Sequence, residues 1–257
     1  MKIILINFKT HLKKILIILF LLIILPILFF PENFLKLNKV NGLIKGLGFE
    51  LNYIQISGNK SISKEDIVKK IVFINCDNLF CVDLKLSKNE IEKNNWVSSA
   101  KLKYSLPSKL SIFIEEEKPT FLLRENEKTT LLNASGKKIQ VIDIISNDYK
   151  NLLILSGNGV ENKILNLLNI FSISNSVSEN IKEATLVSSR RWSLKHSSNI
   201  IIELPEDEPA QAFFKLVELE KKYGFLHKRL KKIDLRVSDR MIIQLKNNSD
   251  LLNENDA

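Results

Sequence analysis

The sequence predicts an α+β protein with one N-terminal transmembrane helix, a β-α-α-β-β module, and an antiparallel β-rich domain with two helices. Three observations support this prediction. They are an apolar run near the N-terminus, two Ser-x-x-acid helix starts between alternating segments, and many short alternating segments after Pro119. Hydrophobic residues make up 45% of the 257 residues, so the chain can bury a packed core and is not generally disordered.

Composition and charge exclude several classes of function. The formal net charge is +9, and Lys2, Lys9, Lys13 and Lys14 supply +4 of it within the first 14 residues. The remaining excess is too small to indicate nucleic-acid binding. Two cysteines and three scattered histidines do not provide a zinc module or a disulfide-rich scaffold. We therefore expect no metal, no cofactor, no nucleic acid and no small-molecule substrate.

Residues 15–30 are apolar throughout and contain one proline, Pro26. As a helix they would span about 24 Å, slightly less than the usual membrane helix of about 20 residues. No small-x-small cleavage pattern follows the run, so a retained transmembrane helix is expected rather than a cleaved signal peptide. The preceding lysines place residues 1–14 in the cytoplasm by the positive-inside rule and the rest of the chain across the membrane.

The elements of the first module, residues 49–119, follow from local patterns. Residues 51–57 alternate and end in a Ser-Gly-Asn turn, which predicts a strand. Ser63 and Ser87 each precede an acidic residue by three positions, which predicts the starts of two helices. Residues 97–104 and 110–116 alternate on either side of a Leu-Pro-Ser turn, which predicts a hairpin.

The second module, residues 120–247, is expected to be rich in strands. Two helices interrupt them, one across residues 160–171 and one beginning at Asp207-Glu208-Pro209. Residues 31–48 are interpreted as a connector after the membrane helix, and residues 248–257 as a polar disordered tail. The predicted strands lie at residues 121–124, 129–132, 138–141, 152–156, 181–187, 192–196, 200–204, 232–237 and 240–245.

Two local features leave alternatives open. Cys76 and Cys81 enclose four residues, and in an oxidising compartment they form either a disulfide or two separate thiols. Glu115, Glu116 and Glu117 form either a solvated strand end or, if a pocket surrounds them, a catalytic carboxylate cluster. No nucleophile elbow, zinc-binding His-Glu motif or phosphate-binding glycine loop is present, so we expect no enzyme activity.

An ordered set of short motifs resembles the FtsQ/DivIB family of bacterial cell-division proteins over about residues 1–246. The residues that carry the resemblance are Ile54-Gln55-Ile56-Ser57-Gly58-Asn59, Ile62-Ser63-Lys64-Glu65-Asp66-Ile67, Asn78-Leu79-Phe80-Cys81-Val82-Asp83-Leu84, Trp96-Val97-Ser98-Ser99-Ala100, Leu106-Pro107-Ser108-Lys109-Leu110, Glu116-Lys118-Pro119, Arg190-Arg191-Trp192-Ser193-Leu194 and Ile233-Asp234-Leu235-Arg236. The resemblance implies that residues 49–119 are a POTRA domain.

The resemblance also implies a non-catalytic, single-pass scaffold in the bacterial inner membrane, at the division septum. Its N-terminus would be cytoplasmic and its C-terminal domains periplasmic. It would recruit the FtsB and FtsL homologues, and its POTRA domain would contact other division proteins. The alternative is a POTRA-type accessory of protein secretion or outer-membrane assembly. Such proteins usually carry several POTRA repeats or a long barrel, whereas only about 140 residues follow Pro119 here.

The expected partner-binding site is the last strand and the arginines near it. Residues 241–245 are mostly apolar and precede the polar tail, which suggests an edge strand that accepts a partner strand. Arg190 and Arg236 would pair with partner carboxylates, or form ordinary surface ion pairs. Val237 stands where the family often has an aromatic residue, and Trp192 is expected in the core. The resemblance thus implies an FtsB-binding set of Arg190, Arg236, Val237, Met241, Ile242, Ile243, Gln244 and Leu245.

Overall fold

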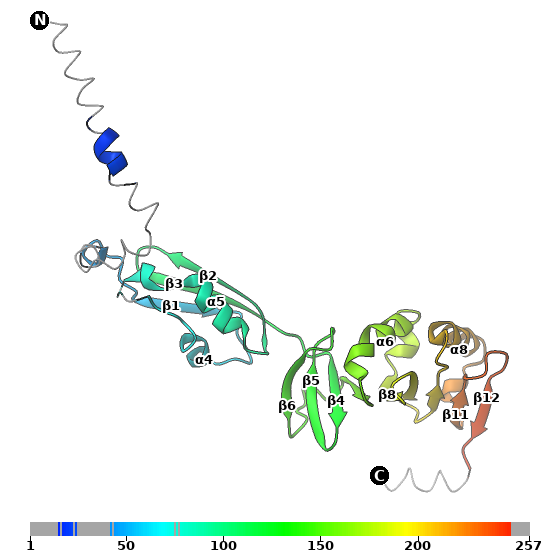
Figure 1. Cartoon of the computed structure of the whole chain (residues 1–257). Helices are drawn as coiled ribbons and strands as arrows, with labels where there is room; N and C mark the ends of the chain where they lie inside the picture. Colours follow the sequence, from blue (N-terminus) through cyan, green and yellow to red (C-terminus); the bar gives the residue numbers. More distant parts are fainter. Residues whose placement is uncertain are drawn as a thin grey trace, which may run out of the picture. The chain divides into compact units, whose positions relative to one another are not determined.

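The computed structural model describes residues 15, 17–22, 24, 42, 44–74, 76 and 78–247. The chain divides into two compact units, Met1–Glu116 and Glu117–Ala257, which are described separately (Figure 1). The predicted basic tail at residues 1–14 and the polar tail at residues 248–257 lie outside the described residues, as does most of the predicted connector at residues 31–48.

The predicted transmembrane helix is the part of the fold class that the structure contradicts. Within the described residues, no helix is both long enough and apolar enough to cross a bilayer. The prediction for the other residues of this run falls outside the described part of the chain.

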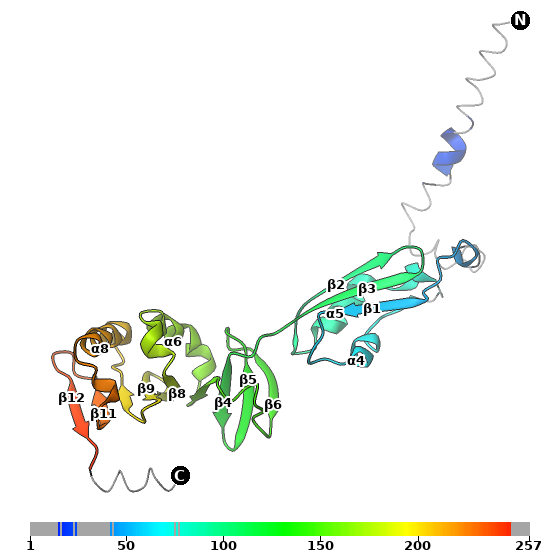
Figure 2. The ribbon, with the colours of Figure 1, turned by 180° about the vertical axis from the view of Figure 1, so that it is seen from behind.

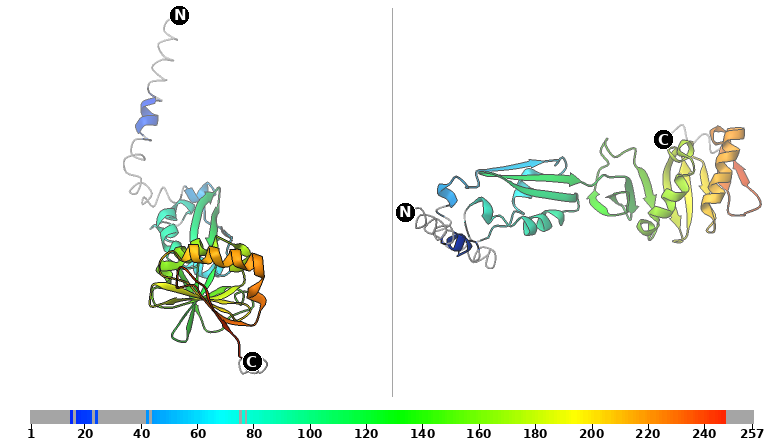
Figure 3. Two further views of the ribbon diagram at one scale, coloured as in Figure 1. Left: turned by 90° about the vertical axis from the view of Figure 1, so that its right-hand side faces the viewer. Right: turned by 90° about the horizontal axis from the view of Figure 1, so that it is seen from above.

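The first unit is a three-stranded sheet with helices on one face. Strand β3 lies in the centre, parallel to β1 and antiparallel to β2. Figure 3 shows the helices on one side of this sheet. The elements are, in chain order, β1 (Tyr53–Ser57), α4 (Lys64–Val68), the 3₁₀ turn η1 (Leu79–Cys81), α5 (Leu84–Glu92), β2 (Val97–Ser105) and β3 (Lys109–Glu116).

Capping residues set where the two helices begin. The Ser63 hydroxyl accepts a hydrogen bond from the Asp66 N–H at 3.1 Å, so the predicted first cap is correct. The predicted second cap is wrong, because Asp83 caps α5 and Ser87 lies inside that helix. Ser87 is fully buried, and its hydroxyl accepts a hydrogen bond from the Val72 N–H at 2.8 Å. The Ser87 hydroxyl therefore stabilises the loop before α5 and does not cap a helix.

The core of the first unit lies between the helices and one face of the sheet. Ile67 of α4 and Ile91 of α5 pack against Leu110, Ile112 and Ile114 of β3, all of which are buried. Alternate residues of a strand point to opposite faces, so the other residues of β3 lie on the opposite, open face. The helices thus cover one face of this sheet and leave the other free.

Cys76 and Cys81 are joined by a disulfide, with their Cα atoms 5.5 Å apart. Cys81 is fully buried, and the Asn78 N–H donates to its sulfur atom at 3.1 Å. Asn78 in turn caps η1 by accepting from the Phe80 N–H. The disulfide therefore fastens the segment that leads into α5.

The second unit contains a nine-stranded sheet in the order β12-β11-β10-β9-β8-β7-β4-β5-β6. Its strands are β4 (Phe121–Glu125), β5 (Lys128–Leu132), β6 (Lys138–Ile142), β7 (Leu153–Ser156), β8 (Ile181–Val187), β9 (Arg191–His196), β10 (Ile201–Glu203), β11 (Leu230–Asp234) and β12 (Ile242–Leu245). The helices are α6 (Ile164–Phe171), α7 (Asn175–Ser178) and α8 (Pro209–Tyr223), with the 3₁₀ turns η2 (Val160–Lys163) and η3 (Phe225–His227).

The α+β class of this unit is confirmed, but the sheet is mixed rather than simply antiparallel. Among the described strands, three neighbouring pairs are parallel: β4–β7, β7–β8 and β10–β11. A parallel pair needs a crossover connection, and α6 and α8 provide it between β7 and β8 and between β10 and β11. The short helix α7 adds to the two helices expected from the sequence.

Helices α6 and α8 pack on one face of this sheet, and Figure 3 shows α8 lying across the strands. Trp192 of β9 and Phe213 of α8 are the largest fully buried side chains in the resulting core. The indole N–H of Trp192 donates to the Asn166 side chain of α6 at 2.9 Å. Trp192 is therefore a core residue, as the sequence predicted.

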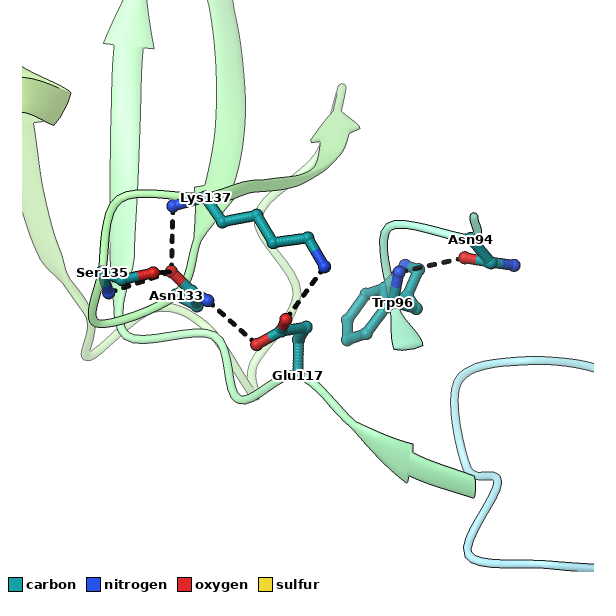
Figure 4. A network of polar contacts seen from close by, with 6 residues as sticks. All are labelled: Asn94, Trp96, Glu117, Asn133, Ser135 and Lys137. Atoms are coloured by element: carbon teal, nitrogen blue, oxygen red, sulfur yellow. Dashed lines mark hydrogen bonds and ion pairs between the residues drawn. The ribbon is translucent and has the colours of Figure 1, made fainter. Parts of the chain in front are cut away.

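The three consecutive glutamates at the junction of the units do not converge on one site. Glu115 accepts from the Ser99 hydroxyl at 3.0 Å, and Glu116 accepts from the backbone N–H groups of residues 60–62. Glu117 accepts from Asn133 at 2.9 Å and forms an ion pair with Lys137 at 2.9 Å (Figure 4). Each carboxylate thus has a separate structural partner.

Glu116 is expected to stabilise the first unit in a pH-dependent way. Burial acts to raise the pKa of Glu116, but the N–H groups of Lys60, Ile62 and Ser61 together hold the pKa below its ordinary value. A carboxyl with a lowered pKa contributes stability above its unfolded-state pKa and loses it as the pH falls through its folded-state pKa. We expect Glu116→Ala to lower the free energy of unfolding by about 2 kcal/mol at neutral pH.

Urea unfolding at several acidic pH values, followed by hydrogen exchange within residues 49–116, measures this effect. Below the folded-state pKa of Glu116, the difference between wild type and Glu116→Ala should shrink. Glu115→Ala is the matched control, and its effect should stay below about 0.5 kcal/mol because that side chain is exposed. Equal losses in both variants would contradict the role of Glu116.

Candidate partner-binding edge

Strand β12 is an edge strand of the nine-stranded sheet. It pairs antiparallel with β11, in the register Asp234↔Ile242, Ile233↔Ile243 and Lys232↔Gln244. Figure 2 shows it at the outer edge, beside β11. All four of its residues are exposed, including Ile242 at 50%, Ile243 at 45% and Leu245 at 65%. The alternative in which both faces of this strand are buried therefore does not hold.

An open edge strand presents a row of backbone N–H and C=O groups that a further strand can bind. On β12 this row lies between apolar side chains on both faces. A partner strand would satisfy the backbone groups and cover the exposed isoleucines at the same time, which is the physical basis of β-augmentation. Met241, just before the strand, is half-buried and packs against the core, so it anchors the start of β12.

Arg236 lies in the loop between β11 and β12, where Asp234 holds its guanidinium. The Arg236 Nε donates to both carboxylate oxygens of Asp234, at 2.9 and 3.0 Å, and Nη2 donates to Oδ2. These hydrogen bonds lower the pKa of Asp234. Arg236 Nη1 forms no hydrogen bond with a described residue, so it remains available to an acceptor from outside.

A cleft of about 630 Å³ lies beside the start of β12, between α8 and the β11–β12 loop. Leu219 and Leu235 contribute apolar side chains to its lining. Three residues of the predicted site, Arg236, Val237 and Met241, also line it. The structure therefore brings the predicted loop residues together next to the open edge.

Arg190 reaches the same region through an ion pair. Its guanidinium lies 3.4 Å from the carboxylate of Glu206, which lines the cleft. Both side chains are more than half exposed, so the pair contributes at most about 1 kcal/mol. Arg240, another cleft residue, is likewise paired with Asp239. Because Arg190, Arg236 and Arg240 are paired within the chain, a partner carboxylate must share or displace these ion pairs.

The acidic side of the cleft was not predicted from the sequence. Glu206, Asp207 and Glu208 line it together with Asp239. The sequence signal was the acidic run before Pro209, which was interpreted only as the start of α8. Helix starts favour acidic residues anyway, so the pattern could not reveal a second role.

The described part of the chain contains no group of three or more His, Cys, Asp or Glu side chains that could hold a metal ion. His196 is buried, and its Nδ1 lies 2.7 Å from the Ser198 hydroxyl. Burial lowers the pKa of His196, and the nearby His227 lowers it further. His196 is therefore part of the buried interior of the second unit. Its strand, β9, is separated from β12 by β10 and β11.

The folds of the two units define the class of protein. A β-α-α-β-β unit precedes a β-rich unit that ends in the edge strand β12. Residues 49–117 match the family model of the POTRA domain, FtsQ-type, and residues 122–236 match the C-terminal model of the cell division protein FtsQ/DivIB. The chain belongs to the FtsQ/DivIB family of cell-division proteins, which confirms the resemblance found in the sequence.

Individual relatives agree with this assignment. The chain is 24% identical over 205 residues to the cell division protein FtsQ of Novosphingobium aromaticivorans, covering 79% of this chain and 63% of the relative. It is 26% identical over 206 residues to FtsQ of Rickettsia felis, covering 77% of this chain and 73% of the relative. The chain spans about three fifths of the length of the first curated relatives it matches.

A solved structure also matches, at a lower level of similarity. It is the major extracytoplasmic domain of the trans isomer of the cell division protein DivIB from Geobacillus stearothermophilus, with a TM-score of 0.31 and 8% identity. The match covers 43% of this chain and 96% of the solved chain.

Proposed function

We propose that this protein is a non-catalytic scaffold of the cell-division machinery that recruits the FtsB/FtsL pair to the division septum. The observation that carries the proposal is the open edge of β12, which is exposed on both faces. A segment of the FtsB homologue adds to this edge as a further strand. Membership in the FtsQ/DivIB family supports the role in division.

In this proposal, backbone pairing with β12 supplies most of the affinity, and ion pairs with the arginines add a smaller part. Arg236 offers Nη1 to a partner carboxylate while Asp234 keeps its guanidinium in place. Arg190 and Val237 contribute at the border of the site, where Val237 is 43% exposed. Exposed ion pairs are worth at most about 1 kcal/mol each, whereas a strand bound along β12 also buries Ile242, Ile243 and Leu245.

The disulfide between Cys76 and Cys81 supports a position for the folded units outside the cytoplasm. Disulfides persist in oxidising compartments such as the periplasm and are rare in the reducing cytosol. A partner that reaches the edge strand would then carry its binding segment in the same compartment. We therefore place the interaction with the FtsB and FtsL homologues on the outer side of the inner membrane.

A proline at the edge tests the proposal. The full-length chain is titrated with the extracytoplasmic segment of the FtsB homologue from the same bacterium, and binding is measured by calorimetry. We expect Ile243→Pro to weaken binding about 100-fold or more, because proline removes a backbone donor and disturbs the pairing of the edge. Arg236→Glu should weaken binding about tenfold, because the new glutamate repels the partner carboxylate that Arg236 attracts.

Val141→Pro is the matched control, because Val141 is an exposed residue of β6, the strand at the other edge of the same sheet. Binding should change less than about threefold in this variant. Binding that survives Ile243→Pro, or that is lost equally in Val141→Pro, would contradict docking at β12. Circular dichroism of each variant verifies that the chain still folds.

A further inference from the structure

The open face of the POTRA sheet, opposite the helices, carries an ordered set of side chains. Three neighbouring rows cross it from β1 through β3 to β2. The rows are Ser57–Phe113–Lys101, Gln55–Ser111–Lys103 and Tyr53–Lys109–Ser105. Three lysines and an exposed phenylalanine therefore occupy one face of a single small sheet.

The charge of this face differs from the charge of the domain as a whole. Residues 49–117 contain ten lysines, no arginine and ten acidic residues, so the domain has no formal net charge. Lys101, Lys103 and Lys109 nevertheless lie together on the open face, and none of them forms an ion pair with a described residue. Glu115, at one end of the face, is hydrogen-bonded to Ser99. The face is locally basic on a neutral domain.

The face also has a shape that a ligand can occupy. A groove of about 530 Å³ runs over it, and the three lysines, Phe113, Gln55 and Ser111 contribute to its lining. Among the residues that the structure describes, no acidic side chain lines this groove. Phe113 is 48% exposed, so an apolar surface lies beside the ammonium groups. The groove thus combines unpaired positive charge, hydrogen-bonding side chains and one aromatic ring.

We propose that this face binds an extended acidic peptide segment of a partner protein, at a second docking surface separate from β12. Lys101 and Lys103 are two residues apart on β2, so their Cα atoms repeat at about 6.6 Å. Carboxylates at alternate positions of an extended peptide repeat at the same distance. Lys109 lies diagonally across from Lys103, within about 8 Å, and extends the positive surface to the neighbouring strand. A hydrophobic side chain of the peptide covers Phe113.

A simpler interpretation predicts a different result. Lysines on an edge strand such as β2 also discourage pairing between sheets of different molecules. In that case the lysines would need no ligand, and an acidic peptide would bind no better than a neutral one. An anionic lipid surface is the other source of negative charge, but it would be expected to contact protruding loops rather than a groove across a sheet.

The test uses the full-length chain and a short fluorescein-labelled peptide that alternates glutamate with serine around one central phenylalanine. Binding is followed by fluorescence anisotropy. We expect saturable binding that weakens as NaCl rises from about 50 to about 300 mM, because salt screens exposed charges. The Lys101→Gln/Lys103→Gln/Lys109→Gln variant should bind at least about tenfold more weakly. Phe113→Ser should weaken binding without changing its salt dependence.

Two controls distinguish this face from general charge and from the β12 edge. The Lys60→Gln/Lys85→Gln/Lys88→Gln variant removes three exposed lysines of the same domain that lie outside the three rows, and it should bind the peptide normally. Ile243→Pro should also leave this binding unchanged, so the two docking proposals can fail separately.

Three outcomes would overturn the proposal. The first is an equal affinity for a peptide with glutamine in place of glutamate. The second is an equal loss in the two lysine variants. The third is binding to vesicles containing anionic phospholipid, lost in the Lys101/Lys103/Lys109 variant, without binding to the peptide. The last result would assign the face to a lipid surface instead.

Discussion

Replacing Trp192 by alanine is expected to destabilise the second unit by about 4 kcal/mol, the largest effect of any single change considered for this protein. Trp192 is 1% exposed and lies at the centre of the core between α6, α8 and the sheet. The substitution leaves a cavity and removes the hydrogen bond that the indole N–H donates to Asn166. Because Asn166 is an exposed residue, water can replace the indole as its partner, so the cavity accounts for most of the cost.

Urea unfolding and hydrogen exchange measured on individual peptides test this prediction. Amides of β8, β9 and β10 should exchange much faster in Trp192→Ala, while amides of residues 53–116 should keep their protection. Trp192→Phe fills most of the volume without the indole N–H, and Asn166→Ala removes the acceptor, so the two variants separate packing from hydrogen bonding. Unchanged protection of β9 in Trp192→Ala would show that Trp192 is not central to the core.

Replacing Gly58 by alanine is expected to destabilise the first unit by about 3 kcal/mol. Gly58 adopts φ +84°, a conformation that costs a residue with a Cβ about 1–2 kcal/mol. A Cβ at this position would lie 2.0 Å from the carbonyl oxygen of Ile114, so the backbones of β1 and β3 would have to separate. The neighbouring N–H groups of residues 60–62 would then lose their alignment with Glu116.

Gly48→Ala is the matched control for this prediction. Gly48 has nearly the same φ, +86°, but a Cβ at this position would meet no described atom within 4 Å beyond its own chain neighbours. Gly48→Ala should lower the free energy of unfolding by only about 1 kcal/mol, because it adds backbone strain alone. Urea unfolding, read through hydrogen exchange of β1 and β3, gives both values. Equal losses of stability in the two variants would mean that backbone strain, and not the contact with Ile114, makes alanine unfavourable at residue 58.

Much of the fold could be predicted from local sequence patterns, because each pattern satisfies a physical requirement of a strand or a helix end. The alternation of β8 and β9 predicted both strands closely, because alternate residues must face the core and the solvent. The Ser63 cap was readable because a Ser hydroxyl satisfies an unpaired N–H at a helix start. Ser87 shows the limit of such patterns, since the same spacing occurs inside α5, where the hydroxyl satisfies the Val72 N–H from a distant loop.

Other features depend on contacts between distant parts of the chain. No local pattern distinguishes a parallel from an antiparallel neighbour, so the mixed order of the nine-stranded sheet could not be derived from alternation. The cleft beside β12 combines the acidic run before α8 with the loop after β11, which are about thirty residues apart in the sequence. The predicted membrane helix rested on hydropathy alone, and no described helix is long and apolar enough to support it.

The amino-acid pattern alone was sufficient for the two-module order, the short strands and the family, because each depends on residues that are neighbours in the chain. The sequence already suggested an edge strand at residues 241–245, but its exposure on both faces and the lysine-bearing face of the POTRA sheet required the folded structure. The pairings β11–β12 and β2–β3 join strands that follow one another in the chain. The other neighbours of β11 and β3 are the distant strands β10 and β1, and these pairings decide which strands lie at an edge. Both proposed docking surfaces therefore combine a pairing between chain neighbours with a pairing between distant strands.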